Sequence, residues 1–272
     1  MSFSRVVILG CGYAGSRVLA LAQRRGLPVV ASVRSEERAP ALREAGAEVL
    51  VAPRLGSELE PHLTPDARVV VAFPAHAETD SWLAPLLTRV HSAVYVSSTG
   101  VYGELRGRID DATPLPAAED ARVLKLRAAE DTYRAAGVCV LRCPAIYGPD
   151  RGLHVRVLRG EHRIPGDGSR WLSRIHAEDL AQFALGPAAP GETFLTGDLE
   201  PAPHIDVVRF ICERYGVPMP PAAPLETLHA SLRADRAVDS ARARERLGVT
   251  LRFPSYRQGM APEATGIAPR RP

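Results

Sequence analysis

Short apolar runs rich in β-branched residues alternate with helix-like stretches through the first half of the chain, and no other feature limits the fold as strongly. The apolar runs are Val6–Leu9, Pro28–Val33, Ala47–Val51, Ala67–Phe73, Ala93–Ser97 and Val138–Leu141. The helix-like stretches that separate most of them are Gly15–Arg25, Pro40–Ala45, Thr79–Arg89 and Ala118–Ala136. Such alternation is typical of βαβ units, which build a parallel sheet covered by helices on both faces. The sequence therefore predicts an α/β fold with a doubly wound parallel sheet.

The pattern changes near residue 145, where short helical stretches and connections rich in Pro and Gly follow. We expect residues 1–145 to form the sheet core and residues 146–260 to form a smaller mixed region that completes the domain. Residues 261–272 have little apolar content, and we expect them to be a disordered tail.

The composition excludes several classes of protein. Hydrophobic residues make up 46% of the chain and charged residues 24%, which is typical of a soluble globular domain. No window approaches the roughly 18 consecutive apolar residues of a membrane span, and the N-terminus lacks the features of a secretory signal. The four cysteines are too few and too scattered for a disulfide framework. We therefore expect a cytoplasmic protein without a membrane partner.

The charged residues argue against two further classes. The chain has 34 basic residues, and Lys125 is the single lysine, so the other 33 are arginines. Arginine suits phosphate groups, but these arginines are interleaved with 31 acidic residues, and we expect no nucleic-acid partner. The eight histidines include no pair spaced for a metal ion, so no metal site is predicted.

The glycine-rich segment Gly10-Cys11-Gly12-Tyr13-Ala14-Gly15 follows the first apolar run and opens the first predicted helix. In this context Gly10 permits a tight turn, Gly12 lets the backbone approach a pyrophosphate, and Gly15 allows close packing of helix on strand. The helix N-terminus then attracts the anion. A purely structural turn is the alternative. The segment predicts a dinucleotide site formed by Gly10, Gly12, Tyr13, Ala14 and Gly15, with Cys11 as a small filler.

The end of the second apolar run indicates which dinucleotide is bound. NAD-binding sites usually carry an acid there, which binds the ribose 2′-hydroxyl. The stretch Ala31–Ser35 contains no acid, whereas Ser32 and Arg34 can bind a 2′-phosphate. The sequence therefore favours NADP(H) over NAD(H).

A third motif, Val94–Gly103, is a strand that ends in hydroxyl residues and continues into Val-Tyr-Gly. With the glycine-rich segment, Leu141–Pro149 and Arg174–Leu180, it makes the chain resemble the NAD-dependent epimerase/dehydratase family, the extended branch of the short-chain dehydrogenases/reductases. The resemblance covers most of residues 5–260. It implies a Rossmann-type fold with a small C-terminal substrate region. It also implies an oxidoreductase or epimerase that acts on a carbonyl or hydroxyl compound such as a nucleotide-linked sugar.

The resemblance also implies site residues. Ser98 takes the position of the family's catalytic serine or threonine, whose hydroxyl hydrogen-bonds the reacting substrate oxygen. The further cofactor contacts that it implies are Ala72, Phe73, Pro74, Ser97, Thr99, Pro144 and Ala145. On the substrate side it implies Arg151, Trp171, Arg174 and His176, and the arginines suit an anionic small molecule. Trp171 as a core aromatic and His176 as a helix cap are the structural alternatives.

One part of the family pattern is missing. The family's acid/base tyrosine precedes a lysine by four residues, but Ala121 stands four residues before Lys125. Arg127 can replace the lysine's charge, with Val123 at the tyrosine position, yet an arginine stays protonated and carries no proton. We therefore hypothesise that Tyr147 is the acid/base, with Tyr102 as the alternative, since a tyrosine in Val-Tyr-Gly more often packs structurally. A non-catalytic NADP(H)-binding sensor or regulatory protein is the alternative.

Overall fold

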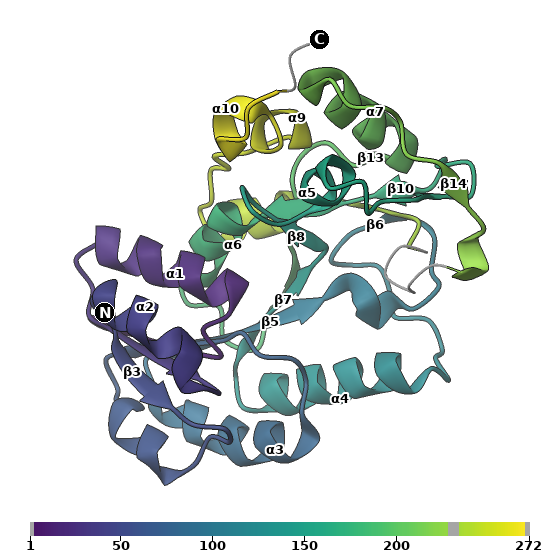
Figure 1. Cartoon of the computed structure of the whole chain (residues 1–272). Helices are drawn as coiled ribbons and strands as arrows, with labels where there is room; N and C mark the ends of the chain where they lie inside the picture. The colour runs from purple at the N-terminus through teal and green to yellow at the C-terminus, as the bar shows by residue number, and fades with distance from the viewer. Residues whose placement is uncertain (1–2, 228–233, 270–272) are drawn as a thin grey trace.

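The computed structural model describes residues 3–227 and 234–269, and its centre is one sheet of seven parallel strands (Figure 1). The strands lie in the order β12-β7-β5-β4-β1-β2-β3. They are β1 (Arg5–Leu9), β2 (Val29–Val33), β3 (Glu48–Val51), β4 (Ala67–Val71), β5 (Ser92–Ser98), β7 (Cys139–Cys143) and β12 (Thr193–Leu195). The chain winds outward from β1 to β3, returns to β4 and winds outward on the other side. The predicted doubly wound Rossmann-type sheet is confirmed.

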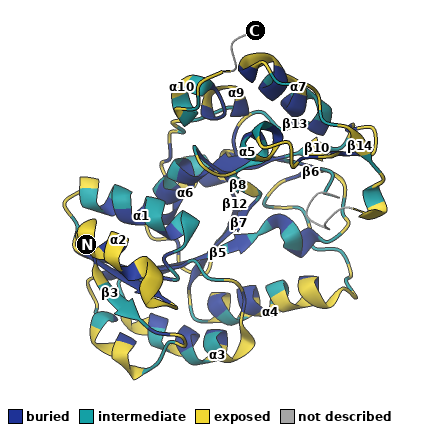
Figure 2. Cartoon of the chain, viewed as in Figure 1, coloured by how far each residue is buried: buried dark blue, intermediate teal, exposed yellow. Residues whose placement is uncertain are grey.

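Helices cover both faces of the sheet, and the alternation of strand side chains decides what they contact. Val6 and Ile8 of β1 point into one apolar cluster, whereas Val7 and Leu9 point into another. The first cluster contains side chains of α1 (Tyr13–Arg24), α2 (Ala39–Glu44), α6 (Ala177–Ala184) and α8 (Ala241–Arg246). The second contains side chains of α3 (Ala77–Leu86) and α4 (Ala121–Ala135). Apart from the edge strand β3, which is half-buried, the strands are accordingly mostly buried, while the outer surfaces of α2, α3 and α4 are exposed (Figure 2).

A group of short strands and helices lies beyond the carboxyl ends of the strands, at the top of Figure 1, and is called the third layer below. Its strands pair two by two: β6 (Gly107–Ile109) with β15 (Arg236–Val238), β8 (Ala145–Tyr147) with β11 (Arg174–His176), β9 (Ile164–Pro165) with β14 (Ala222–Ala223), and β10 (Trp171–Leu172) with β13 (Ala202–Pro203). Its helices are α5 (Leu153–Leu158), α7 (His204–Tyr215), α9 (Tyr256–Gly259) and α10 (Pro262–Thr265). Short 3₁₀ turns, η1 to η5, are Glu36–Arg38, Ser57–His62, Leu87–Arg89, Thr99–Tyr102 and Leu225–Thr227.

The C-terminal segment is more ordered than its sequence predicts. Pro262–Thr265 forms α10, where we expected a disordered tail. The Tyr215 hydroxyl donates to the carbonyl of Met260 at 2.9 Å and lies 2.6 Å from Oγ1 of Thr265, and Ile267 packs against the apolar cluster of the third layer. These contacts anchor a segment that is poor in apolar residues. Residues 270–272 of the predicted tail lie outside the described residues.

The described residues, 3–227 and 234–269, were searched for membrane helices and metal sites. Within these ranges no helix has the length and apolar composition that a membrane crossing needs. In the same ranges, no group of three metal-ligating side chains converges. All four cysteines are buried and unpaired by disulfides.

Two buried histidines meet in the third layer. Nε2 of His162 lies 2.8 Å from Nε2 of His204, and the rings stack with their centroids 4.9 Å apart. Burial, followed by nearby positive charge, lowers the pKa of His162 to about 4. Burial, followed by the neighbouring His162, lowers the pKa of His204 to about 3. The pair is therefore uncharged at neutral pH, with one ring donating to the other.

We expect acid to destabilise the protein through this pair. Because both folded-state pKa values lie below the ordinary 6.5, the unfolded chain takes up protons first as the pH falls. The stability present above pH 6.5 is then lost progressively towards about pH 4, by roughly 1 kcal/mol per pH unit for each histidine. Urea unfolding between pH 7 and about pH 4.5 measures this slope. His162→Gln should flatten it, and His91→Gln should not; equal slopes in all three proteins would contradict the expectation.

Candidate functional site

The carboxyl edge of the sheet brings the predicted cofactor residues together. Ligands of doubly wound sheets bind at this edge, where the strand order reverses, and here the reversal lies between β1 and β4. The glycine-rich segment follows β1, and the other predicted contacts follow β2, β4, β5 and β7. Those that remain partly or fully exposed along the edge are Arg34, Ala72, Phe73, Pro74, Ser98, Pro144 and Ala145. One exposed strip therefore crosses five neighbouring strands.

The glycines of the β1–α1 loop are required by close approaches. Gly10 has a φ of +81°, and a Cβ on it would lie 2.8 Å from Cβ of Phe73 in the loop after β4. A Cβ on Gly15 would lie 3.0 Å from Cγ2 of Ile8, so the first helix packs directly on β1. Ser32 is buried, and its Oγ accepts the backbone N–H of Gly10 at 3.0 Å. Ser32 therefore shapes the loop, which does not support the predicted contact with a phosphate.

The first turn of α1 is suited to an anion. Gly12 is the N-cap without a capping side chain, and the turn contains no acidic residue. The first backbone N–H groups of a helix have no partner within it, so those of Tyr13 and Ala14 are donors for a ligand. A Cβ on Gly12 would meet no atom closer than 3.9 Å, and one of its two neighbours within 4.0 Å is the guanidinium of Arg38. A dinucleotide's pyrophosphate fits this cradle.

Arg38, whose guanidinium lies beside Gly12, was not predicted from the sequence. It lies in η1, directly after Glu36 and Glu37, and an acidic stretch of that kind is usually solvated surface. Nη1 of Arg43 binds Oε1 of Glu36 at 2.5 Å, so part of the negative charge beside Arg38 is neutralised. Cys11, in the same loop, is an inert filler because burial, offset in part by Arg38, raises its thiol pKa to about 11.

The segment of residues 97–103, called the serine loop below, begins at the end of β5. Ser98 is partly exposed, and its Oγ accepts the backbone N–H of Gly100 at 3.0 Å. A hydroxyl that accepts one bond in this way can still donate its proton to a ligand. The neighbouring Ser97 and Thr99 are buried, so their side chains face the protein interior.

A buried ion pair holds this loop from behind. Ser97 Oγ donates to Glu130 Oε1 at 2.6 Å, and Nη2 of Arg142 binds Oε2 of the same carboxylate at 2.7 Å. Nη1 of Arg142 also donates to the hydroxyl of Tyr102 at 3.0 Å. The network ties the end of β5 to α4 and β7. It also occupies the Tyr102 hydroxyl, whose ring is fully buried.

The helix α4 presents Val123 and Arg127 to the serine loop. A Cβ on Gly103 would lie 3.7 Å from Cγ2 of Val123. Arg127 donates from Nε and Nη2 to the carbonyl oxygen of Val101 at 3.0 and 2.8 Å. Val123 and Arg127 occupy the positions that the resemblance gives to the family's tyrosine and lysine, and both face the loop. Neither side chain carries a titratable hydroxyl.

Tyr147, the hypothesised acid/base, is packed into the third layer. Its side chain is 1% exposed, its ring contacts Gly259 of α9, and its hydroxyl has no hydrogen-bond partner among the described residues. Burial, followed by the negative charge of Asp198, raises the pKa of the phenol above its ordinary range. This position does not support proton transfer to a substrate by Tyr147.

The predicted substrate residues divide into exposed and buried pairs. Trp171 is 45% exposed, and Arg151 is exposed with its guanidinium 5.0 Å from the centre of the Tyr13 ring. Arg174 is buried against the ring of Tyr256, which does not support a direct contact with substrate. His176 is also buried, and its Nδ1 accepts the Glu178 N–H at 3.3 Å as the N-cap of α6. Burial lowers the pKa of His176 to about 4, as expected for a neutral cap.

A polar contact joins the glycine-rich segment to the third layer. The Tyr13 hydroxyl donates to Oδ1 of Asp150 at 3.0 Å, and Arg17 binds the same oxygen at 3.1 Å. Tyr13 and Arg17 are four residues apart and share a helix face. Neither Arg17 nor Asp150 could be predicted as a contact from the sequence, because the two residues are more than 130 positions apart in the chain.

The fold and this edge define an α/β protein of the Rossmann type with an open anion cradle at the start of α1. No family model matches the sequence. Protein YeeZ from Escherichia coli (strain K12) is 26% identical over 198 residues, which cover 65% of this chain and 70% of that protein. A functionally unknown conserved protein from Silicibacter pomeroyi DSS is 28% identical, with a TM-score of 0.81 and 97% and 98% of the two chains covered.

Similar solved structures also include members of the epimerase/dehydratase family. UDP-glucuronic acid 4-epimerase from Bacillus cereus in complex with NAD has a TM-score of 0.77 at 16% identity, with 96% of each chain covered. At this identity the likeness shows a shared fold. The Rossmann-type fold that the resemblance implies is therefore confirmed.

Proposed function

We propose that this protein is an NADP(H)-dependent oxidoreductase or epimerase that acts on a carbonyl or hydroxyl compound such as a nucleotide-linked sugar. The observation that carries the proposal is the exposed carboxyl edge, where an anion cradle at Gly12 and the hydroxyl of Ser98 belong to one strip. Residues 1–145 supply the dinucleotide side, and residues 146–260 supply the substrate side. The similar epimerase that binds NAD supports a dinucleotide of this kind.

In this proposal the backbone N–H groups of Tyr13 and Ala14 bind the pyrophosphate, with Gly10, Gly12 and Gly15 giving the backbone its close approach. The remainder of the dinucleotide lies along the residues after the other strands, which are Ala72, Phe73, Pro74, Ser97, Thr99, Pro144 and Ala145. When bound, the nicotinamide supplies or accepts a hydride. Ser97 and Thr99 act by positioning the end of β5, because both side chains are buried.

Ser98 is the proposed catalytic residue. Its hydroxyl donates to the reacting oxygen of the substrate, which changes between a hydroxyl and a carbonyl. The Gly100 N–H holds the Ser98 hydroxyl in place. Trp171 and Arg151 are the exposed residues proposed for the substrate side.

A non-catalytic NADP(H)-binding sensor or regulator is the second candidate. The observation that favours it is the surface of α4 facing the serine loop, where Val123 and Arg127 offer no proton carrier. Following cofactor absorbance with a panel of carbonyl compounds and nucleotide sugars separates the two. Turnover with any compound supports the enzyme. Tight NADPH binding with no turnover across the panel supports the regulator.

We expect NADPH to bind more tightly than NADH because of Arg34, which follows β2. Charge-assisted contacts to a phosphate contribute about 1.5–3 kcal/mol. Because Arg34 and Arg38 are exposed to solvent, we expect Arg34→Ala or Arg38→Ala to weaken NADPH binding roughly tenfold. Calorimetric titration with each dinucleotide measures this. The affinity for NADH should change little in Arg34→Ala, whereas Arg38→Ala, beside the cradle at Gly12, should weaken both dinucleotides. Arg24→Ala at the far end of α1 is the matched control. Equal wild-type affinities for the two dinucleotides would contradict the preference.

A further inference from the structure

The short turn η4 follows Ser98 directly, and the Ser98 side chain caps it. Oγ of Ser98 accepts the backbone N–H of Gly100 at 3.0 Å, and the turn ends at Gly103, whose φ is +56°. The hydroxyl proposed to contact the substrate is therefore also the N-cap of the turn. Its orientation depends on where the turn, and with it the Gly100 N–H, is held.

Two arginines hold the C-terminal end of this turn by its carbonyl groups. Arg127 of α4 donates from Nε and Nη2 to the carbonyl oxygen of Val101 at 3.0 and 2.8 Å. Arg236 of β15 donates from Nη1 to the carbonyl oxygens of Gly103 at 2.6 Å and Leu105 at 3.2 Å. The last carbonyl groups of a helical turn have no partners within it, and a cation there is favourable. Because a guanidinium group presents its N–H donors in a rigid plane, these carbonyl groups are fixed relative to α4 and β15.

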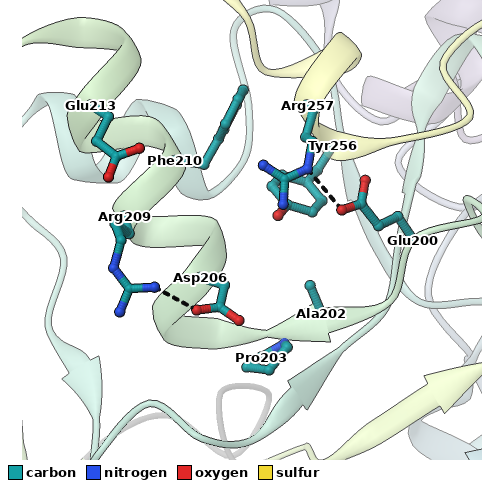
Figure 3. Close-up of a pocket in the computed structure, with 9 residues that line it drawn as sticks. All are labelled: Glu200, Ala202, Pro203, Asp206, Arg209, Phe210, Glu213, Tyr256 and Arg257. Carbon is teal, nitrogen blue, oxygen red and sulfur yellow. Dashed lines mark hydrogen bonds and ion pairs between the residues drawn. The ribbon is translucent and has the colours of Figure 1, made fainter.

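Neither of these two arginines forms an ion pair with a carboxylate within residues 3–227 and 234–269. The usual arrangement is seen beside a cavity of about 410 Å³ lined by α7 and α9, where Arg257 binds Glu200 at 2.8 Å (Figure 3). Arg236 is only 7% exposed, and a buried cation without a counter-ion is costly. The hydrogen bonds to the backbone of η4 and of the residues after it are therefore what stabilise this guanidinium.

α4 and β7 also contact the turn from the side. A Cβ on Gly100 would lie 3.1 Å from Cδ1 of Leu126, so α4 packs closely against the turn. Nη1 of Arg142, on β7, donates to the hydroxyl of Tyr102 at 3.0 Å. The turn thus rests on α4 and β7, and the two guanidinium groups fix its C-terminal end.

We propose that Arg127 and Arg236 are positioning residues, which hold η4 by its carbonyl groups so that the turn orients the Ser98 hydroxyl. Neither arginine has to touch a substrate or a dinucleotide for this role. A donor that leaves its orientation stabilises the developing charge of a reaction less. The effect on a reaction rate rests on the proposed function, whereas the hold on the turn does not.

Amide hydrogen exchange, measured by NMR on the full chain, tests the hold. Arg127→Met removes both donors and keeps an apolar stem, and we expect the Gly100 amide to exchange about tenfold faster. Arg127→Lys keeps the charge and a donor, and its Gly100 exchange should stay within about threefold of the wild type. The Val69 amide, in the central strand β4, should not change in either variant. Arg122→Met, at an exposed position of α4, is the matched control and should leave both amides unchanged.

Unchanged Gly100 exchange in Arg127→Met overturns the inference. Equal acceleration at Gly100 and Val69 also overturns it, because it would report a loss of stability of the whole domain. If Arg127→Met fails to fold, Arg127→Gln is measured in the same way, and the same two results decide.

Hydride transfer with a substrate from the panel tests the consequence for Ser98. In Arg127→Met the rate should fall about tenfold, while KM and the affinity for NADPH stay within about twofold, and Arg127→Lys should recover most of the rate. Full rate in Arg127→Met overturns the positioning role. A loss of NADPH affinity as large as the loss of rate also overturns it, since Arg127 would then bind the dinucleotide. If no compound in the panel reacts, the enzyme reading of the proposed function fails, and Gly100 exchange still decides whether the arginine holds the turn.

Discussion

Replacing Glu130 by alanine is expected to lower the free energy of unfolding by about 3–5 kcal/mol. The Glu130 carboxylate is 1% exposed and binds Arg142, which is 7% exposed. Removing the carboxylate leaves the guanidinium as a buried charge without its counter-ion, and it leaves the Ser97 hydroxyl without its acceptor. Since whole domains are stable by only about 5–15 kcal/mol, the loss is a large fraction of the total. Urea unfolding at neutral pH measures it.

Asp131 provides the matched control for this variant. It is the next residue of α4, its side chain is exposed, and it pairs with Arg134 one turn away. Asp131→Ala should cost no more than about 0.5 kcal/mol, because exposed ion pairs contribute little. Glu130→Gln should fall between the two, since it keeps an acceptor for Ser97. Equal losses in Glu130→Ala and Asp131→Ala would mean that the buried pair is not the source of the effect.

Removing the Ser98 hydroxyl is expected to slow hydride transfer by about 10²–10³-fold, the usual effect of deleting one donor that stabilises a developing oxyanion. The reason is its position: it is the partly exposed hydroxyl at the end of β5, oriented by the Gly100 N–H. Single-turnover absorbance changes with Ser98→Ala and a substrate from the panel measure the rate.

Two controls separate chemistry from folding in this experiment. Ser98→Thr keeps the hydroxyl and the cap on η4, and it should retain most of the rate. Ser81→Ala removes an exposed hydroxyl from α3 and should have no effect. Dinucleotide affinity should stay within about twofold in all three variants, as expected for a group that acts mainly in the transition state. Full activity in Ser98→Ala would exclude the proposed role.

The sheet could be predicted from sequence because its signals are local. β-Branched runs and helical spacing each occupy a few neighbouring residues, and the predicted strands differ from the observed ones mostly at their ends. The glycine-rich segment is equally local, and the close approaches of Gly10 and Gly15 follow its pattern. The C-terminal helix α10 has no such signal, since it is ordered by contacts with Tyr215 on α7.

Side-chain roles were harder to predict, because burial and pairing join distant parts of the chain. Ser32 suited a phosphate by residue type, but its hydroxyl is used by the glycine-rich loop. Tyr147 suited proton transfer, but α9 covers it. The contacts of the Asp150 carboxylate and the Arg38 guanidinium could not be predicted, because the fold brings each of them to the glycine-rich segment from another part of the chain.

The bond between Tyr13 and Asp150 gives the first turn of α1 two attachments. The backbone of Tyr13 faces the anion cradle, while its side chain binds the segment that leads from β8 into the third layer. The residue that offers its backbone N–H to an anion is therefore the same residue whose hydroxyl contacts the third layer.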